Sequence, residues 1–186
     1  MVVRLKTNWN LDRGARTHSE TASVISTNIW RIITGSLLNM ENEGFATDSN
    51  SQRLDILSEF AAYAIHLLDR YLYSSSQASE RQKIVSQTAQ HLEGIIQDNR
   101  LDTKAATNAN VPFMTLLNDR TDKYSECKYD EEPGFDMRRV LGDYVSEIMH
   151  GENRKWTATY ILDIVAYNIH SNLLKVLDNF LSDSTS

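Results

Sequence analysis

Apolar residues recur along most of this chain at the spacing of three and four positions that is typical of amphipathic α-helices. The first such stretch places Ile25, Ile29, Ile33 and Leu37 on one side. Continued along the chain, the pattern predicts six helices, at about residues 18–42, 51–73, 79–98, 112–124, 135–150 and 153–182. We therefore expect an all-α fold, a compact single-domain bundle of about six helices packed ridge into groove.

The expected helix ends carry suitable residues. Thr17 and Glu20 have the spacing of a capping box, and Gly44 supplies a stop for the first helix. Only 7 glycines and 2 prolines occur among 186 residues, which leaves few of the tight turns that a β-rich fold needs. Residues 1–16, which include Trp9, have no sustained period and are predicted to form a polar arm, and residues 183–186 a frayed tail.

An eight-residue pattern occurs twice, as EFAAYAIH at residues 59–66 and as DIVAYNIH at residues 163–170. Both copies hold an acid, a tyrosine and a histidine, so both could supply a catalytic or metal-binding group. These candidate residues are Glu59, Tyr63, His66, Asp163, Tyr167 and His170. A helical wheel nevertheless places the two copies in different environments.

In the helix at 51–73, the polar residues share one arc of roughly 140°, centred near His66. They are Asp55, Ser58, Glu59, Tyr63, His66, Asp69, Arg70 and Tyr73. The rest of the circumference is apolar. We therefore predict a central helix with one wet edge, and interpret its polar stripe as a solvated face.

In the helix at 153–182, Asp163 and His170 fall far from the polar stripe, on the same side as Trp156 and Leu177. We predict that both point toward the core, where each needs a partner because an unpaired buried polar group is costly. About 10 Å of helix separates them, so they cannot bond to each other. The candidate partners are Tyr63, His66, Arg70, Arg31 and Asn28.

Other chemistry leaves little trace in the sequence. Glu147 and His150 have the i, i+3 spacing that di-iron bundles use twice, but no second such pair accompanies them and both lie on the polar side of their helix. Cys127 stands among acidic residues, which disfavours its thiolate. We predict no metal site, no cofactor and no catalytic residue.

Charge and hydropathy bear on partners. The formal net charge of −6 repels a phosphate backbone, so we expect no nucleic-acid partner. No run of about 18 apolar residues occurs, and the start lacks the apolar region of an export signal, so we expect no membrane partner. The single cysteine allows no intramolecular disulfide. Together these features predict a cytoplasmic protein.

Two hypotheses about function follow. The first is a non-enzymatic helical protein that acts through protein–protein contacts, including self-association, because the broad apolar arc at 51–73 and the tryptophans Trp30 and Trp156 could serve an interface. The second is a small-molecule or metal pocket between the helices at 51–73 and 153–182, built from Asp163, His170 and the polar residues facing them.

Overall fold

A computed structural model describes residues 17–103, 111–150 and 154–182 of the chain. The predicted polar arm at 1–16 and the tail at 183–186 lie outside the described residues. Within them the chain forms the helices α1 (His18–Asn42), α2 (Asn50–Ser75), α3 (Ala78–Asp102), α4 (Phe113–Ser125), α5 (Phe135–Ile148) and a last helix made of α6 (Arg154–Tyr160), η2 (Ile161–Val165) and α7 (Ala166–Ser182).

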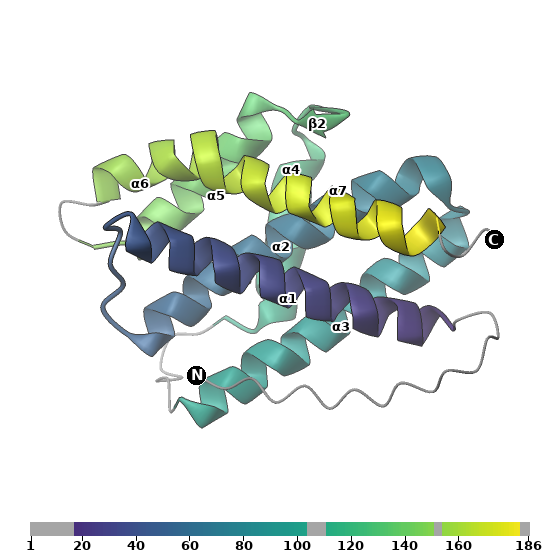
Figure 1. The fold of residues 1–186 in the computed structure, drawn as a ribbon, viewed down its shortest axis with the longest axis horizontal. Coiled ribbons are helices and arrows are strands. Elements are labelled where there is room, and N and C mark those ends of the chain that lie inside the picture. Colours follow the sequence, from purple (N-terminus) through teal and green to yellow (C-terminus); the bar gives the residue numbers. More distant parts are fainter. Residues whose placement is uncertain (1–16, 104–110, 151–153, 183–186) are drawn as a thin grey trace.

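This arrangement confirms the predicted all-α bundle of about six helices (Figure 1). Two features were not predicted. A pair of two-residue strands, β1 (Tyr129–Asp130) and β2 (Glu132–Pro133), forms a tight antiparallel hairpin between α4 and α5. The other is η2, a π-helical turn inside the last helix.

Local sequence sets the ends of α1 as predicted. The Thr17 hydroxyl accepts from the backbone N–H of Glu20 at 3.3 Å, and the Thr17 N–H donates to Glu20 Oε2 at 2.9 Å, which completes a capping box. After the last turn, Gly44 adopts a φ of 94°, a left-handed conformation that suits glycine. Both signals are local, so they could be identified from a few neighbouring residues.

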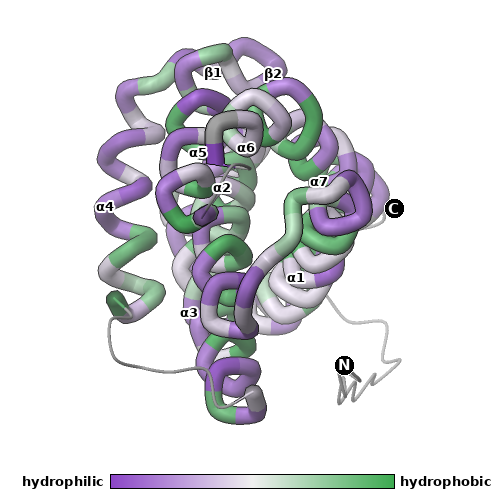
Figure 2. Tube along the Cα trace, turned by 90° about the vertical axis from the view of Figure 1, so that its left-hand side faces the viewer, coloured by the Kyte–Doolittle hydropathy of each residue, from purple (hydrophilic) through white to green (hydrophobic). Residues whose placement is uncertain are grey.

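The centre of the bundle is α2. It packs against α1, α3, α4, α5 and α7, and most of its length is buried on every side. Figure 2 shows it between α4 on one flank and α1 and α7 on the other. A helix covered on all sides has no wet edge, so any polar side chain on α2 must find its partner inside the protein.

The helices α5 and α6 approach each other closely at Gly142. A Cβ atom added to Gly142 would lie 2.7 Å from the carbonyl oxygen of Ala158, so only glycine fits at this crossing. The contact fixes the relative position of α5 and the start of the last helix.

No helix within the described residues combines the length and the hydropathy needed to cross a lipid bilayer.

Candidate functional site

The prediction that Asp163 points toward the core is wrong. Asp163 is exposed, whereas His170, seven residues later, is buried as predicted. The cause is η2, in which the Ala166 N–H donates to the carbonyl of Ile161, five residues back instead of four. Such a turn accommodates one extra residue, so side chains before it are rotated by about 100° relative to a continuous α-helix.

Arg138 of α5 stabilises this irregular turn. Its Nη1 donates to the carbonyl of Leu162 at 2.9 Å, inside the segment where the α-helical hydrogen bonding is interrupted. Its Nε donates to the carbonyl of Pro133 at 3.2 Å, and its guanidinium carbon lies 4.1 Å from the ring centroid of Tyr167. Arg138 thereby holds together η2, the hairpin and the start of α7, and Tyr167 serves as its stacking partner.

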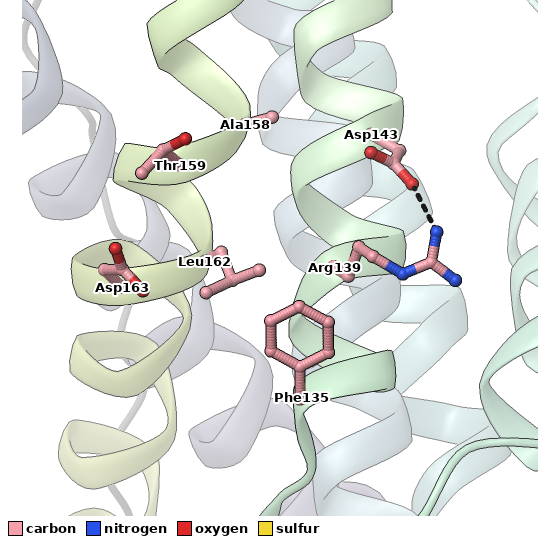
Figure 3. A pocket seen from close by; sticks show the side chains of 7 residues that line it. All are labelled: Phe135, Arg139, Asp143, Ala158, Thr159, Leu162 and Asp163. Carbon is pink, nitrogen blue, oxygen red and sulfur yellow. Dashed lines mark hydrogen bonds and ion pairs between the residues drawn. The ribbon is translucent and has the colours of Figure 1, made fainter.

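The rotation places Asp163 at the edge of a groove between α5 and the last helix (Figure 3). This α5–α6 groove has a volume of about 340 Å³. Its lining residues are Phe135, Arg139, Asp143, Ala158, Thr159, Leu162 and Asp163. Arg139 Nη1 and Asp143 Oδ2 are 3.4 Å apart on the α5 wall, and no ion pair within the described part of the chain includes Asp163.

Beside the groove, three apolar residues line the outside of α6 and η2. We call Trp156, Tyr160 and Ile164 the outer stripe. Trp156 is 65% exposed and Ile164 43%, while the half-buried Tyr160 packs on Phe45 with ring centroids 4.7 Å apart. Trp156 was predicted to lie on the inward side of its helix, and its exposure shows that this prediction is wrong. Trp30, the other tryptophan considered for an interface, is buried.

The prediction that α2 carries a solvated polar face is also wrong. Glu59, Tyr63 and His66 are only 3%, 0% and 6% exposed, because α4 and α5 pack on α2. A helical wheel gives the direction of a side chain but not what lies opposite it. Here the opposite elements bring their own polar groups, and the result is a buried polar cluster. Its members are Glu59, Tyr63, His66, Arg70, Arg120 and Tyr124.

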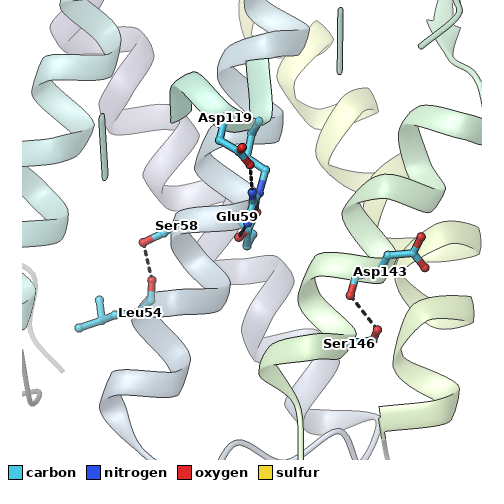
Figure 4. A network of polar contacts seen from close by, with 7 residues as sticks. Leu54, Ser58, Glu59, Asp119, Asp143 and Ser146 are labelled. Atoms are coloured by element: carbon cyan, nitrogen blue, oxygen red, sulfur yellow. Dashed lines mark hydrogen bonds and ion pairs between the residues drawn. The ribbon is translucent and has the colours of Figure 1, made fainter. Parts of the chain in front are cut away.

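Figure 4 shows Glu59 of α2 beside Asp119 of α4. The next residue of α4, Arg120, holds Glu59 in a two-point ion pair, with Nε to Oε2 at 2.8 Å and Nη2 to Oε1 at 2.7 Å. Arg120 also bonds to Asp119, and its guanidinium carbon lies 3.3 Å from the ring centroid of Tyr144. Burial raises the pKa of Glu59, and the hydrogen bonds from Arg120 oppose that rise. Both carboxylate oxygens are therefore occupied by a protein partner.

His66 is a neutral acceptor in this cluster. Arg70 Nε donates to His66 Nε2 at 3.2 Å, and Arg70 Nη2 donates to the carbonyl of Ser125 at 3.3 Å. The His66 ring lies 5.3 Å from that of Tyr124. Burial, with a further contribution from the positive charge of Arg70, lowers the pKa of His66 to about 4. His66 thus links α2 to the end of α4 and carries no charge at neutral pH.

His170 of α7 is paired with the hairpin. Its Nε2 lies 3.2 Å from the Tyr129 hydroxyl, and the two rings meet edge to face at 6.0 Å. Burial lowers the pKa of His170, and Glu132 opposes this. Tyr129 was not among the predicted partners, because a two-residue strand leaves no periodic signal in the sequence that could place it beside α7.

Two hydroxyl groups of the buried polar cluster, those of Tyr63 and Tyr124, have no hydrogen-bond partner within the described residues. Both side chains are fully buried, and burial raises the pKa of both phenols. The Tyr63 and Tyr124 rings are 5.6 Å apart.

The six candidate residues therefore do not form one site. Glu59, Tyr63 and His66 belong to the buried cluster under α4. His170 binds the hairpin, Tyr167 stacks on Arg138, and Asp163 lies at the outer groove. Among the residues that the structure describes, no three His, Cys, Asp or Glu side chains are placed to hold a metal ion.

Two further predictions about individual residues are confirmed. Glu147 and His150 of the isolated metal-like motif are both exposed. Burial and the neighbouring acids Asp136 and Glu126 raise the pKa of Cys127, as its acidic surroundings in the sequence indicated.

No protein-family model, no curated protein and no solved structure matches this chain.

Proposed function

We propose that this is a non-enzymatic helical protein that acts through protein–protein contacts, self-association among them, and that the outer stripe and the α5–α6 groove form the contact face. One observation carries the proposal: two large apolar side chains of α6 and η2 are left exposed on the outer side of the helix. Thr157, Ile161 and Val165 are buried on the inner side of α6–η2, while Trp156 and Ile164 on the outer side are exposed. Contiguous exposed apolar side chains on a folded protein mark sites of protein–protein contact.

The neighbourhood of the stripe supports the proposal. Phe135, 57% exposed, lines the α5 wall of the groove, and Trp156 lies three residues before Thr159, which lines the opposite wall. Exposed aromatic residues beside a concave surface are the usual centres of binding energy in protein interfaces. Charged residues at the groove, Arg139, Asp143 and Asp163, supply the polar rim that such interfaces have.

The buried polar cluster favours a structural role over catalysis. Its carboxylate is neutralised by Arg120, and its imidazole is neutral and bonded to Arg70. Groups that satisfy one another inside a packed layer stabilise and align the helices that carry them.

The experiment compares two serine substitutions by sedimentation over a range of protein concentrations. Trp156→Ser should convert an associating protein into a monomer. The matched control is Tyr73→Ser, at another exposed aromatic residue (74%) near the end of α2. The start of α2 contacts α5, because the Gln52 amide donates to the carbonyl of Ile148. Tyr73 lies about 30 Å along the helix from Gln52 and is therefore far from the proposed contact face. Tyr73→Ser should associate as the wild type does. A wild-type protein that is monomeric at every concentration would remove self-association from the proposal.

The second candidate is a small-ligand site in the buried polar cluster between α2 and α4. The hydroxyls of Tyr63 and Tyr124 favour it, because neither has a hydrogen-bond partner within the described residues and such buried groups are unusual. Native mass spectrometry of the purified full chain tests this candidate directly. A bound species that is lost on denaturation would support it, and a mass equal to that of the chain alone would argue against it.

A further inference from the structure

The acidic residues at the groove indicate which kind of segment the contact face binds. Asp163 is exposed at the edge of the groove and free of ion pairs within the described residues, and the Asp143 carboxylate is only loosely paired with Arg139. The exposed Arg154 lies at the start of α6, so the negative charge is concentrated at the groove and not around Trp156. A segment that binds here should therefore bring apolar side chains for the outer stripe and basic side chains for these carboxylates.

The chain itself contains such a segment. Residues 1–16 hold the basic residues Arg4, Lys6, Arg13 and Arg16 and the single acid Asp12. The remaining residues, 17–186, have 15 basic and 24 acidic side chains, a net charge of −9 against +3 for the first 16. The same segment carries large apolar residues, which are Val2, Val3, Leu5, Trp9 and Leu11.

We propose that the α5–α6 groove and the outer stripe bind residues 1–16 of a second copy of this chain, with Trp9 as the apolar anchor and the flanking basic residues opposite Asp163 and Asp143. This inference rests on the proposed function and specifies its partner. The support from residues 1–16 comes from their sequence, and the support from the receiving face comes from its exposed aromatics and unpaired carboxylate.

Geometry favours a second copy over the same molecule. Residue 17 precedes α1, whereas the receiving face lies at the other end of that helix, where Phe45 packs on Tyr160 (Figure 1). A helix of 25 residues is about 37 Å long, and an extended chain covers at most about 3.4 Å per residue. Eight residues separate Trp9 from residue 17 and span at most about 27 Å, which is less than the length of α1, so a second copy is the favoured donor of the segment.

Reciprocal binding would give a closed dimer. If the first copy receives the segment of the second, a two-fold axis lets the second receive that of the first, so the dimer contains two identical contacts and leaves no face open.

Two full-length variants test residues 1–16 and the contact face independently. Trp9→Ser damages the segment and leaves the groove intact, and Asp163→Lys does the reverse at an exposed position of the folded protein. Each alone should weaken dimerisation by about 30-fold or more, the usual effect of removing a central aromatic or charged contact. An equimolar mixture should associate more tightly than either variant alone, because one intact contact can form between unlike copies.

The dimerisation of these variants distinguishes the inference from the proposed function. If Trp9→Ser dimerises as tightly as wild type while Trp156→Ser is monomeric, this inference is overturned and the proposed function stands. If both single variants are monomeric and their mixture does not associate, the segment binds elsewhere or within its own molecule, and the inference is again overturned. If neither tryptophan matters to an associating protein, the contact face itself is wrong and both proposals are overturned.

A synthetic peptide of residues 1–16 provides a second test that does not depend on the variants. Added to full-length wild-type protein, it should compete for the groove and dissociate the dimer, while a scrambled peptide of identical composition should not. Equal competition by both peptides would show that charge alone drives the effect and would overturn the assignment of Trp9. Circular dichroism melts of each variant confirm that the fold is unchanged.

Discussion

The two sides of the molecule reverse the usual distribution of residue types. Under α4, the charged and polar residues Glu59, His66 and Arg120 are enclosed, and each is bonded to another protein group. On α6–η2, Trp156 and Ile164 face outward beside an open groove. The enclosed polar groups owe their stability to fixed partners, whereas the exposed apolar groups have no partner in the described chain. Binding is therefore expected at the apolar face and rigidity at the polar one.

The largest effect should come from the buried ion pair. Arg120→Met leaves the Glu59 carboxylate enclosed without a counter-charge, which should lower the free energy of unfolding by about 3–5 kcal/mol. Urea denaturation measures the change. On the open side, Arg139→Met removes an exposed pair with Asp143 and should cost less than about 1 kcal/mol. Equal losses from the two substitutions would contradict the contrast between the sides.

Acid should weaken the enclosed side. The folded protein resists protonation of His66, whose pKa is about 4, while the unfolded chain accepts the proton near pH 6.5. Stability is therefore complete above pH 6.5 and is lost as the pH falls from 6.5 to 4, by on the order of 3 kcal/mol from this residue. The lowered pKa of His170 acts in the same direction.

Urea denaturation at several pH values tests the contribution of His66. His66→Gln keeps an acceptor for Arg70 but cannot be protonated, so its unfolding free energy should fall less on acidification than that of wild type. The exposed His91 offers a control, since His91→Gln should keep the wild-type profile. A His66→Gln protein with an unchanged acid response would show that other groups cause it.

The close crossing of α5 and α6 should be sensitive to a single methyl group. Gly142→Ala brings a Cβ atom against the Ala158 carbonyl and should lower the unfolding free energy by about 1–3 kcal/mol. Gly94→Ala, in α3 with open space around the added atom, should raise stability by up to about 1 kcal/mol through helix propensity. Thermal melts of the two variants should shift in opposite directions, and a stabilised Gly142→Ala protein would mean that the crossing is looser than described.

The smallest effects concern tyrosine hydroxyls. Tyr63→Phe removes a buried hydroxyl that has no partner among the described residues, and it should change the unfolding free energy by less than about 0.5 kcal/mol, or raise it. Tyr129→Phe removes the bond to His170 and should cost about 0.5–1.5 kcal/mol. Denaturant titrations of the pair compare them directly. A larger loss for Tyr63 would reveal a partner for its hydroxyl.

The helices and their caps were predictable because they depend on residues close in sequence. Thr17 with Glu20 and Gly44 specify the ends of α1 through contacts within a few positions. The buried polar cluster was not predictable in the same way. Arg120 and Glu59 are 61 positions apart, and only the folded chain brings α4 over α2.

Asp163 shows a different limit of sequence reasoning. The wheel for residues 153–182 assumed one constant rotation per residue, and η2 breaks that assumption in the middle. His170 lies after the break, in the same α-helical register as the rest of α7, so its inward direction was predicted correctly. The one extra residue in η2 was enough to make the predicted direction of Asp163 wrong.

The π turn at Ile161–Val165 also allows one helix to serve two surfaces. Deleting a single residue from it would turn α6 by about 100° relative to α7, moving Trp156 off its present bearing and driving Asp163 toward hydrocarbon neighbours. The extra residue changes the rotation of α6 relative to α7. As a result α7 keeps its apolar side buried in the bundle while Trp156 of α6 is exposed.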